Sequence, residues 1–108
     1  MQMRWQILLA VAAVVLTGAS ANAETIEVSQ KGRHFVPETV SIKVGDTIRF
    51  HNDDMFLHHV YVNGPGLNFD SEEQPPGNVL EVKFPHAGDY TVHCRIHPKM
   101  RLDVHVGE

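Results

Sequence analysis

The residues of this chain that could do chemistry are concentrated in one short segment, 94–100. Cys94, His97 and Met100 follow at intervals of three residues and offer a thiolate, an imidazole nitrogen and a thioether. Soft sulfur together with imidazole favours copper or zinc over magnesium or calcium, and two His with one Cys and a weakly held Met describe an electron-transfer copper site. The segment therefore predicts three ligands of one copper ion that cycles between Cu(I) and Cu(II).

A second histidine is needed from elsewhere in the chain. The neighbouring residues His58 and His59 are the candidates. Adjacent side chains of a strand point to opposite faces, so only one of the two can reach the ion. The residues alone leave both candidates open.

Cys94 is the only cysteine, so it cannot form a disulfide within the chain. A free thiol is a liability in an oxidising compartment unless it is buried or bound to a metal. With His97 and Met100 so close, we interpret Cys94 as a ligand rather than as a structural core residue. The histidines without a neighbouring donor are expected to be surface or half-buried residues, and they form no motif for a second copper site: His34, His51, His86, His93 and His105.

Several of these features together resemble a known family. Asn52, the pair His58-His59 before Val60, the run Tyr90-Thr91-Val92-His93-Cys94 and the spacing C-x-x-H-x-x-M are similar to those of the small plastocyanin/azurin-like blue-copper proteins, the cupredoxins. The Cys-to-Met spacing is most like that of the amicyanins. The resemblance covers nearly all of residues 24–108.

The resemblance implies which histidine completes the site. It gives His58, Cys94, His97 and Met100 as the copper ligands, and it puts His59 where the family usually has an asparagine. It also implies that Asn52 ties the two ligand loops together.

The elements that must hold these residues are predicted to be strands. Alternating apolar residues mark strands at 25–29, 39–44, 47–51, 59–62, 79–84, 90–94 and 101–106, and no segment after residue 23 has a helical period. We expect the first to be an edge strand and the second and third to pair through a tight turn at Gly45-Asp46. Residues 67–78 are expected to form a long surface loop. Short strands at regular spacing predict an all-β fold, a two-sheet antiparallel Greek-key β-sandwich.

The N-terminus has the pattern of a signal peptide. Arg4 precedes an apolar run at 7–16 that is too short to span a membrane, and residues 21–23 match an A-x-A cleavage signal. We expect residues 1–23 to be removed and residues 24–108 to form one cupredoxin domain in the periplasm. That region has neither a cysteine for lipid attachment nor a twin-arginine pair, so no membrane anchor is expected.

Charge narrows the choice of partners. Residues 24–108 carry 13 acidic against 8 basic side chains, a formal charge of −5. Such a balance argues against nucleic acid and anionic membranes as partners. We expect a monomer that meets a redox protein or a copper-handling protein. The acidic residues Asp70, Glu72 and Glu73 are either simply solvated or steer a cationic partner.

Two functions fit the predicted site. The first is a carrier of single electrons between redox partners. The alternative is a periplasmic protein that buffers or delivers copper and supports copper tolerance, which the surplus histidines would suit. We do not expect an enzyme, because copper oxidases and nitrite reductases need further histidine-rich centres. A closed structural zinc site would prefer several thiolates or His without Met.

Overall fold

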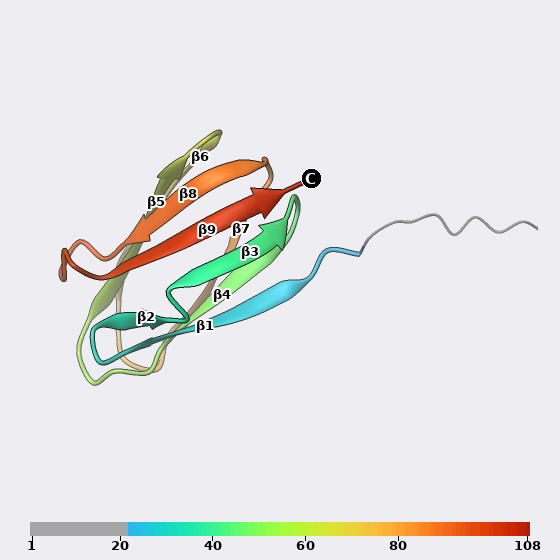
Figure 1. Ribbon diagram of the computed structural model, residues 1–108. Coiled ribbons are helices and arrows are strands. Elements are labelled where there is room, and N and C mark those ends of the chain that lie inside the picture. The colour runs from blue at the N-terminus through green and yellow to red at the C-terminus, as the bar shows by residue number, and fades with distance from the viewer. Residues whose placement is uncertain (1–21) are drawn as a thin grey trace, which may run out of the picture.

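The computed structural model describes residues 22–108, and these form nine strands without a helix (Figure 1). The first 21 residues, most of the predicted signal peptide, lie outside the described part. The strands in chain order are β1 (Thr25–Lys31), β2 (His34–Val36), β3 (Thr39–Lys43), β4 (Thr47–Asn52), β5 (His58–Gly64), β6 (Leu67–Gln74), β7 (Val79–Lys83), β8 (Gly88–His93) and β9 (Arg101–Gly107).

Two sheets pack face to face. One has the strand order β2-β1-β4-β7 and the other β3-β9-β8-β5-β6, and both contribute buried side chains to one core. The core includes aromatic pairs in edge-to-face contact, such as Phe35 with Phe50 and Phe84 with Tyr90. This arrangement confirms the predicted all-β sandwich.

The strand pairing differs from the expectation in two places. β1 lies between β2 and β4, so it is not an edge strand, and its pairing with β4 is parallel, as is that of β3 with β9. The expected pairing of β3 with β4 is wrong, because the turn at Gly45 carries the chain from one sheet to the other. Buried residues alternate with exposed ones in β3 and with half-buried ones in β4. This alternation is the same whether two strands pair edge to edge or pack face to face.

The expected loop at 67–78 is also corrected. Its first eight residues form β6, an edge strand that pairs antiparallel with β5. Leu67, Phe69 and Ser71 are half-buried, while the residues between them are exposed. A solvated edge strand tolerates carboxylates and Asn, which are rare in central strands, and this composition concealed the strand.

The alternation of β8 brings the thiol to the interior. Tyr90, Val92 and Cys94 point into the core, whereas His93 between them is half-buried on the other face. β5 does the same for His58, which shares the inner face with Val60 and Val62. The two loops that follow β4 and β8 therefore meet at one end of the sandwich, opposite the C-terminus (Figure 1).

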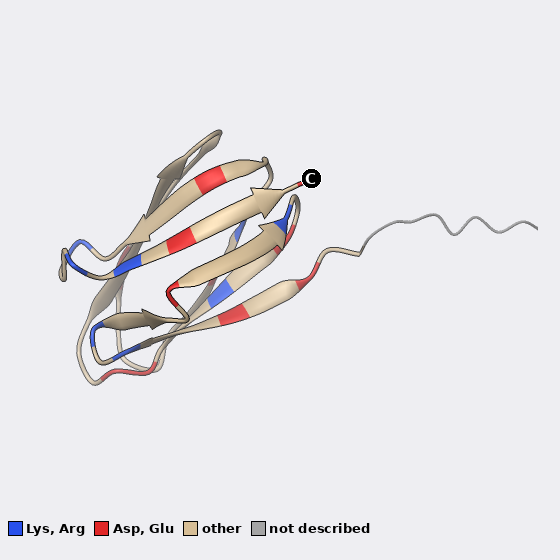
Figure 2. Ribbon diagram, viewed as in Figure 1, with Lys and Arg blue, Asp and Glu red and all other residues tan. Residues whose placement is uncertain are grey.

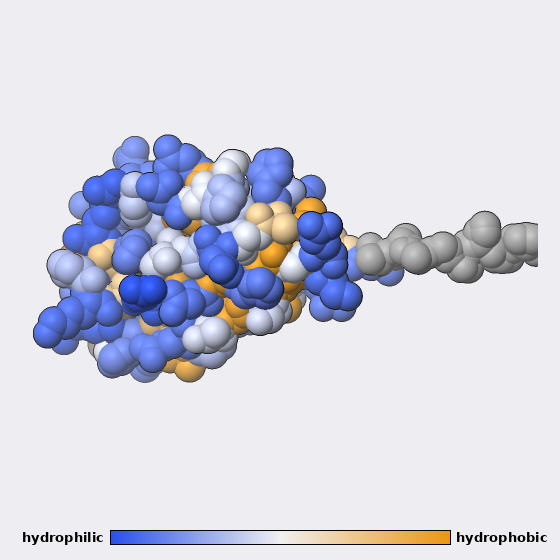
Figure 3. All heavy atoms as spheres, turned by 45° about the horizontal axis from the view of Figure 1, so that its top comes forward, coloured by the Kyte–Doolittle hydropathy of each residue, from blue (hydrophilic) through white to orange (hydrophobic). Residues whose placement is uncertain are grey.

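On the face shown in Figure 3, hydrophobic residues appear as small patches among hydrophilic ones. Within residues 22–108 there is no helix long and apolar enough to cross a membrane.

Candidate metal centre

The thiol of Cys94 contacts the imidazole of His58 inside the protein. Sγ of Cys94 lies 3.8 Å from Nδ1 of His58, and the two side chains are 1% and 0% exposed. The residues are 36 positions apart in the sequence, and β5 and β8 bring them together. A soft donor and a borderline donor thus face each other in a site that excludes water.

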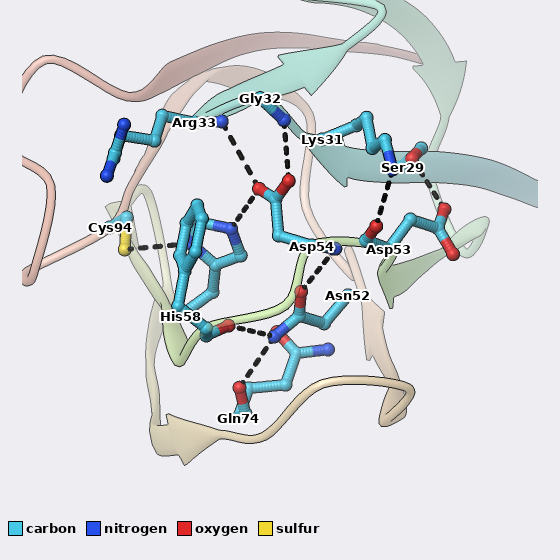
Figure 4. Close-up of polar contacts among 11 residues, drawn as sticks. Ser29, Lys31, Gly32, Arg33, Asn52, Asp53, Asp54, His58, Gln74 and Cys94 are labelled. Carbon is cyan, nitrogen blue, oxygen red and sulfur yellow. Dashed lines mark hydrogen bonds and ion pairs between the residues drawn. The ribbon is translucent and has the colours of Figure 1, made fainter.

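The other ring nitrogen of His58 is held by a carboxylate. Nε2 of His58 lies 2.7 Å from Oδ2 of Asp54, which is itself buried (Figure 4). Asp54 also accepts hydrogen bonds from the backbone amides of Gly32 (2.7 Å) and Arg33 (3.2 Å) in the β1–β2 turn. An ionised carboxylate can only accept, so it binds the Nε2–H tautomer and leaves the lone pair on Nδ1, the atom that faces Cys94.

Asp54 remains ionised although it is buried. Burial raises its pKa, but the hydrogen bond from His58 and those from Gly32 and Arg33 lower it by more, so the net pKa is below the usual value. The carboxylate is therefore available over the whole neutral range to orient the histidine.

His97 lies beside His58. The ring centroids are 5.1 Å apart at an interplanar angle of 69°, and Phe56 packs edge-to-face against both rings. Burial, helped by the nearby His58 and Arg33, lowers the pKa of His97, which favours the neutral imidazole that a metal requires. Nε2 of His97 is buried and has no hydrogen-bond partner. A buried nitrogen without a partner is costly unless something binds it, so the site suits a ligand that accepts a lone pair.

Met100 closes the segment that begins at Cys94. Its side chain is buried, and its backbone amide donates to the carbonyl of His97 (2.9 Å) in a tight turn. Met100 and His97 line the same surface groove.

All four predicted ligands therefore lie at one end of the sandwich. No group of three or more His, Cys, Asp or Glu side chains in residues 22–108 is arranged to hold a metal ion as it stands. Among these four residues, Cys94 contacts His58 through the donor atoms, and His58 contacts His97 through the rings.

His59 points away from this centre. Its Nε2 lies 2.5 Å from Oδ1 of Asp70 on β6, on the other face of the sheet from Cys94. Asp70 also lies 3.5 Å from Arg95. The structure thus brings His58, and not its neighbour, to the thiol.

Asn52 does not have the expected role. Its side-chain nitrogen donates to the carbonyls of Phe56 (3.0 Å) and Gln74 (2.9 Å), and its oxygen accepts from the amide of Asp54 (Figure 4). These bonds shape the β4–β5 loop and fix it to β6, whereas the expectation was a tie to the 94–100 loop.

Two residues of the site were missed by the sequence argument. Asp54 orients His58, and Phe56 packs edge-to-face against both imidazoles. An acidic residue four positions before a histidine is too common a pattern to identify such a partner. The backbone amides that hold Asp54 come from a distant turn and have no side-chain signature.

Comparison with known proteins identifies the family of this chain. A family model for the cupredoxin-like domain matches residues 5–106. The chain belongs to the cupredoxin-like family. It is 30% identical over 100 residues to the chloroplastic plastocyanin of Chlamydomonas reinhardtii, covering 82% of this chain and 69% of that protein. It is 32% identical over 104 residues to the plastocyanin of Pisum sativum, covering 79% of this chain and 62% of that protein.

Solved structures of copper proteins have a similar fold. The Cu(I) form of an amicyanin variant with a single substitution superposes with a TM-score of 0.69 at 26% identity, covering 76% of this chain and 81% of that one. A copper-containing nitrite reductase from Thermus scotoductus superposes with a TM-score of 0.72 at 27% identity. That match covers 88% of this chain but only 25% of the reductase, so the similarity is to one part of that larger enzyme.

Proposed function

We propose that this protein binds one copper ion through His58, Cys94, His97 and Met100 and carries single electrons between redox partners. The observation that carries the proposal is the buried Cys94–His58 contact, in which the histidine is fixed by Asp54 with Nδ1 toward the sulfur. The buried, unpartnered nitrogen of His97 beside it fits a further ligand. The Cu(I) amicyanin structures with the same fold support the choice of metal.

The chain's own residues would make the site suitable for electron transfer. A bound copper ion would supply the one-electron Cu(I)/Cu(II) couple. Asp54 holds His58 in one tautomer, and the β5 and β8 strands hold His58 and Cys94 within a packed core. The segment 94–100 places the ring of His97 beside that of His58. Rigid donors in a dry environment limit rearrangement when the charge changes.

The copper proposal is tested by adding Cu(II) to the purified domain. We expect an intense thiolate-to-copper absorption band that disappears on reduction and returns on reoxidation. Cys94→Ser and His58→Ala should abolish the band. His59→Asn is the matched control, since it changes the adjacent histidine on the opposite face and should keep the band. A band that persists in Cys94→Ser, or none in the unaltered protein, would refute the proposal.

A separate copper-buffering role has less support. It would use the same four ligands, and its separate motivation is the surplus histidines. Four of the surplus histidines instead lie against carboxylates: His34 with Glu38, His51 with Glu27, His59 with Asp70 and His105 with Asp89. We therefore propose electron transfer as the function and a redox protein as the partner.

We also propose that the mature protein is periplasmic and begins at Glu24. The support is the signal-peptide pattern of residues 1–23 and the position of Thr25 at the start of β1, directly after the expected cleavage site. N-terminal sequencing of the protein recovered from a periplasmic extract tests this. A mature chain that starts inside β1, or one that keeps the apolar segment 7–16, would contradict it.

A further inference from the structure

A groove runs beside His97 between two loops of different sheets. The β1–β2 turn forms one side and residues 97–100 form the other. Exposed apolar side chains lie on the two loops that meet at the centre: Met55 is 91%, Leu57 37% and Ile96 42% exposed. Large exposed apolar residues gathered at one end of a small protein mark a surface that another molecule covers.

Two basic side chains line this groove, and two more belong to the adjoining segments. Arg33 and Lys99 line it from opposite sides, and both are exposed. Lys31 precedes the same turn, and Arg95 belongs to the same loop as His97, where it stacks 4.0 Å above the ring of Tyr61. Figure 2 shows Lys and Arg in the β1–β2 turn and in the β8–β9 loop, at the end opposite the C-terminus.

The position of Arg33 is fixed by its surroundings. It adopts a left-handed conformation (φ 62°) that an arginine rarely takes. Its amide donates to Asp54, and its guanidinium lies 4.8 Å above the ring of Phe56. Each contact places the charge at the rim of the groove beside the two histidines, so the cation does not have to be ordered when a partner arrives.

Carboxylates are also present at this end, but none of them lines the groove. Asp54 is buried against His58, and Asp70 lies between His59 and Arg95. Asp53 is exposed, and its carboxylate accepts from Ser29 while its carbonyl accepts from Lys31. The exposed Glu38 lies 3.2 Å from His34 at the edge of the groove. At the far end Glu24, Asp46 and Glu108 gather around a different cavity. The formal charge of −5 for residues 24–108 is thus unevenly distributed.

We propose that this groove docks an acidic partner, a redox protein that presents carboxylates around its own electron-transfer site. The inference rests on the proposed electron-carrier function and names the chemistry of its partner. A groove with a cation on each side, next to loops with exposed apolar side chains, fits such a surface, since opposite charges steer the encounter and the apolar contact brings the two sites together. This reverses the sequence-based alternative of a cationic partner steered by Asp70, Glu72 and Glu73.

One test does not depend on electron transfer. Hexacyanochromate(III) is a paramagnetic trianion, and it broadens the NMR signals of the residues that it approaches. We expect broadening of amides at 31–34 and 95–99 in the reduced, copper-loaded protein, and its loss in added salt. Lys99→Glu should weaken it severalfold. Lys83→Glu, the same charge change on β7, is the control and should leave the pattern in place. Broadening centred elsewhere, or none, would overturn the inference.

A second test measures the rate of electron transfer. We measure the rate of oxidation of the reduced protein by ferricyanide and by the tris(phenanthroline)cobalt(III) cation between about 10 mM and about 300 mM salt, a range over which screening becomes strong. A basic docking face predicts that the ferricyanide rate falls severalfold with salt, whereas the overall charge predicts that it rises. A rise would overturn the inference with the copper function intact. Failure of copper binding would instead refute the proposed function, and the NMR test on the metal-free protein would still decide the docking face.

The same surface could attract an anionic membrane rather than a protein. Co-sedimentation with phosphatidylglycerol vesicles distinguishes the two. If the protein binds the vesicles and Lys99→Glu abolishes this binding, the proposed protein partner is overturned. If the protein does not bind the vesicles, the result supports a protein partner.

Discussion

Nε2 of His58 lies 2.7 Å from the carboxylate of Asp54, while Nδ1 of the same ring faces the sulfur of Cys94 at 3.8 Å. The imidazole therefore joins the thiol to a carboxylate that is fixed by the amides of Gly32 and Arg33. Partners of this kind set the tautomer and orientation of a metal-binding histidine. The β1–β2 turn, distant in sequence, thereby becomes part of the support of the candidate metal centre.

We predict that Asp54→Asn weakens copper binding by about 10- to 100-fold, the usual cost of losing an orienting partner. The amide keeps the shape of the side chain but can donate as well as accept, so it no longer enforces the Nε2–H tautomer. Competition with a Cu(I) chelator measures the change. Asp53→Asn is the matched control, because the Asp53 carboxylate binds Ser29 rather than a ligand. Equal affinities of the two variants would contradict the orienting role.

Asp46 predicts a pH dependence of stability. Its carboxylate accepts from the backbone amides of Glu24 (2.8 Å) and Lys43 (2.9 Å), and these bonds, helped by the charge of Lys43, outweigh burial and lower its pKa. A lowered folded-state pKa adds stability above the unfolded value of about 3.9 and loses it as the pH falls through the folded value. Asp46→Asn should therefore be less stable than the unaltered protein at neutral pH.

Urea unfolding at several pH values checks this expectation. The difference between the two proteins should be largest near neutrality and should shrink below about pH 4. A difference that is constant with pH would show that the Asp46 charge contributes nothing.

The predicted cleavage site gives Asp46 a second role. Oδ1 of Asp46 accepts from the backbone nitrogen of Glu24, which becomes the terminal ammonium if the chain is cut after Ala23. A charged donor makes a stronger hydrogen bond than a neutral amide. We expect the α-amino pKa of the mature chain to be raised, and Asp46→Asn to return it toward about 7.7–8.0. NMR titration of the terminal amine measures it. An amine that titrates identically in both proteins would contradict the contact.

Part of this structure could be predicted from local sequence patterns. Cys94, His97 and Met100 are close in the chain, so their spacing alone indicated the chemistry. Alternation of apolar residues located most of the strands, because each buries one face. The same alternation puts His58 on the inner face of β5, and Cys94, the residue directly after β8, toward the core.

The contacts between distant segments could not be predicted in the same way. Alternation does not say which strand pairs with which, so the separation of β3 and β4 into different sheets was missed. Asp54 depends on two backbone amides about 20 residues away. Nearly every residue has such an amide, so the sequence does not show which ones will bind a carboxylate. The basic groove likewise arises because the fold brings Arg33 beside Lys99, two charges that the overall acidic composition concealed.

The last prediction concerns Tyr90, which fixes the loops at the end of the sandwich away from the candidate metal centre. Its hydroxyl oxygen lies 2.7 Å from the carbonyl oxygens of both Pro65 and His86, which share its one proton, and burial raises its pKa. Tyr90→Phe leaves these carbonyls without their donor, which costs about 1–3 kcal/mol of unfolding free energy. Urea unfolding measures the loss, and Tyr61→Phe, whose ring lies under Arg95, is the control. The copper absorption band should stay unchanged in both variants, and equal stabilities would show that the Tyr90 hydroxyl does not fix the two loops.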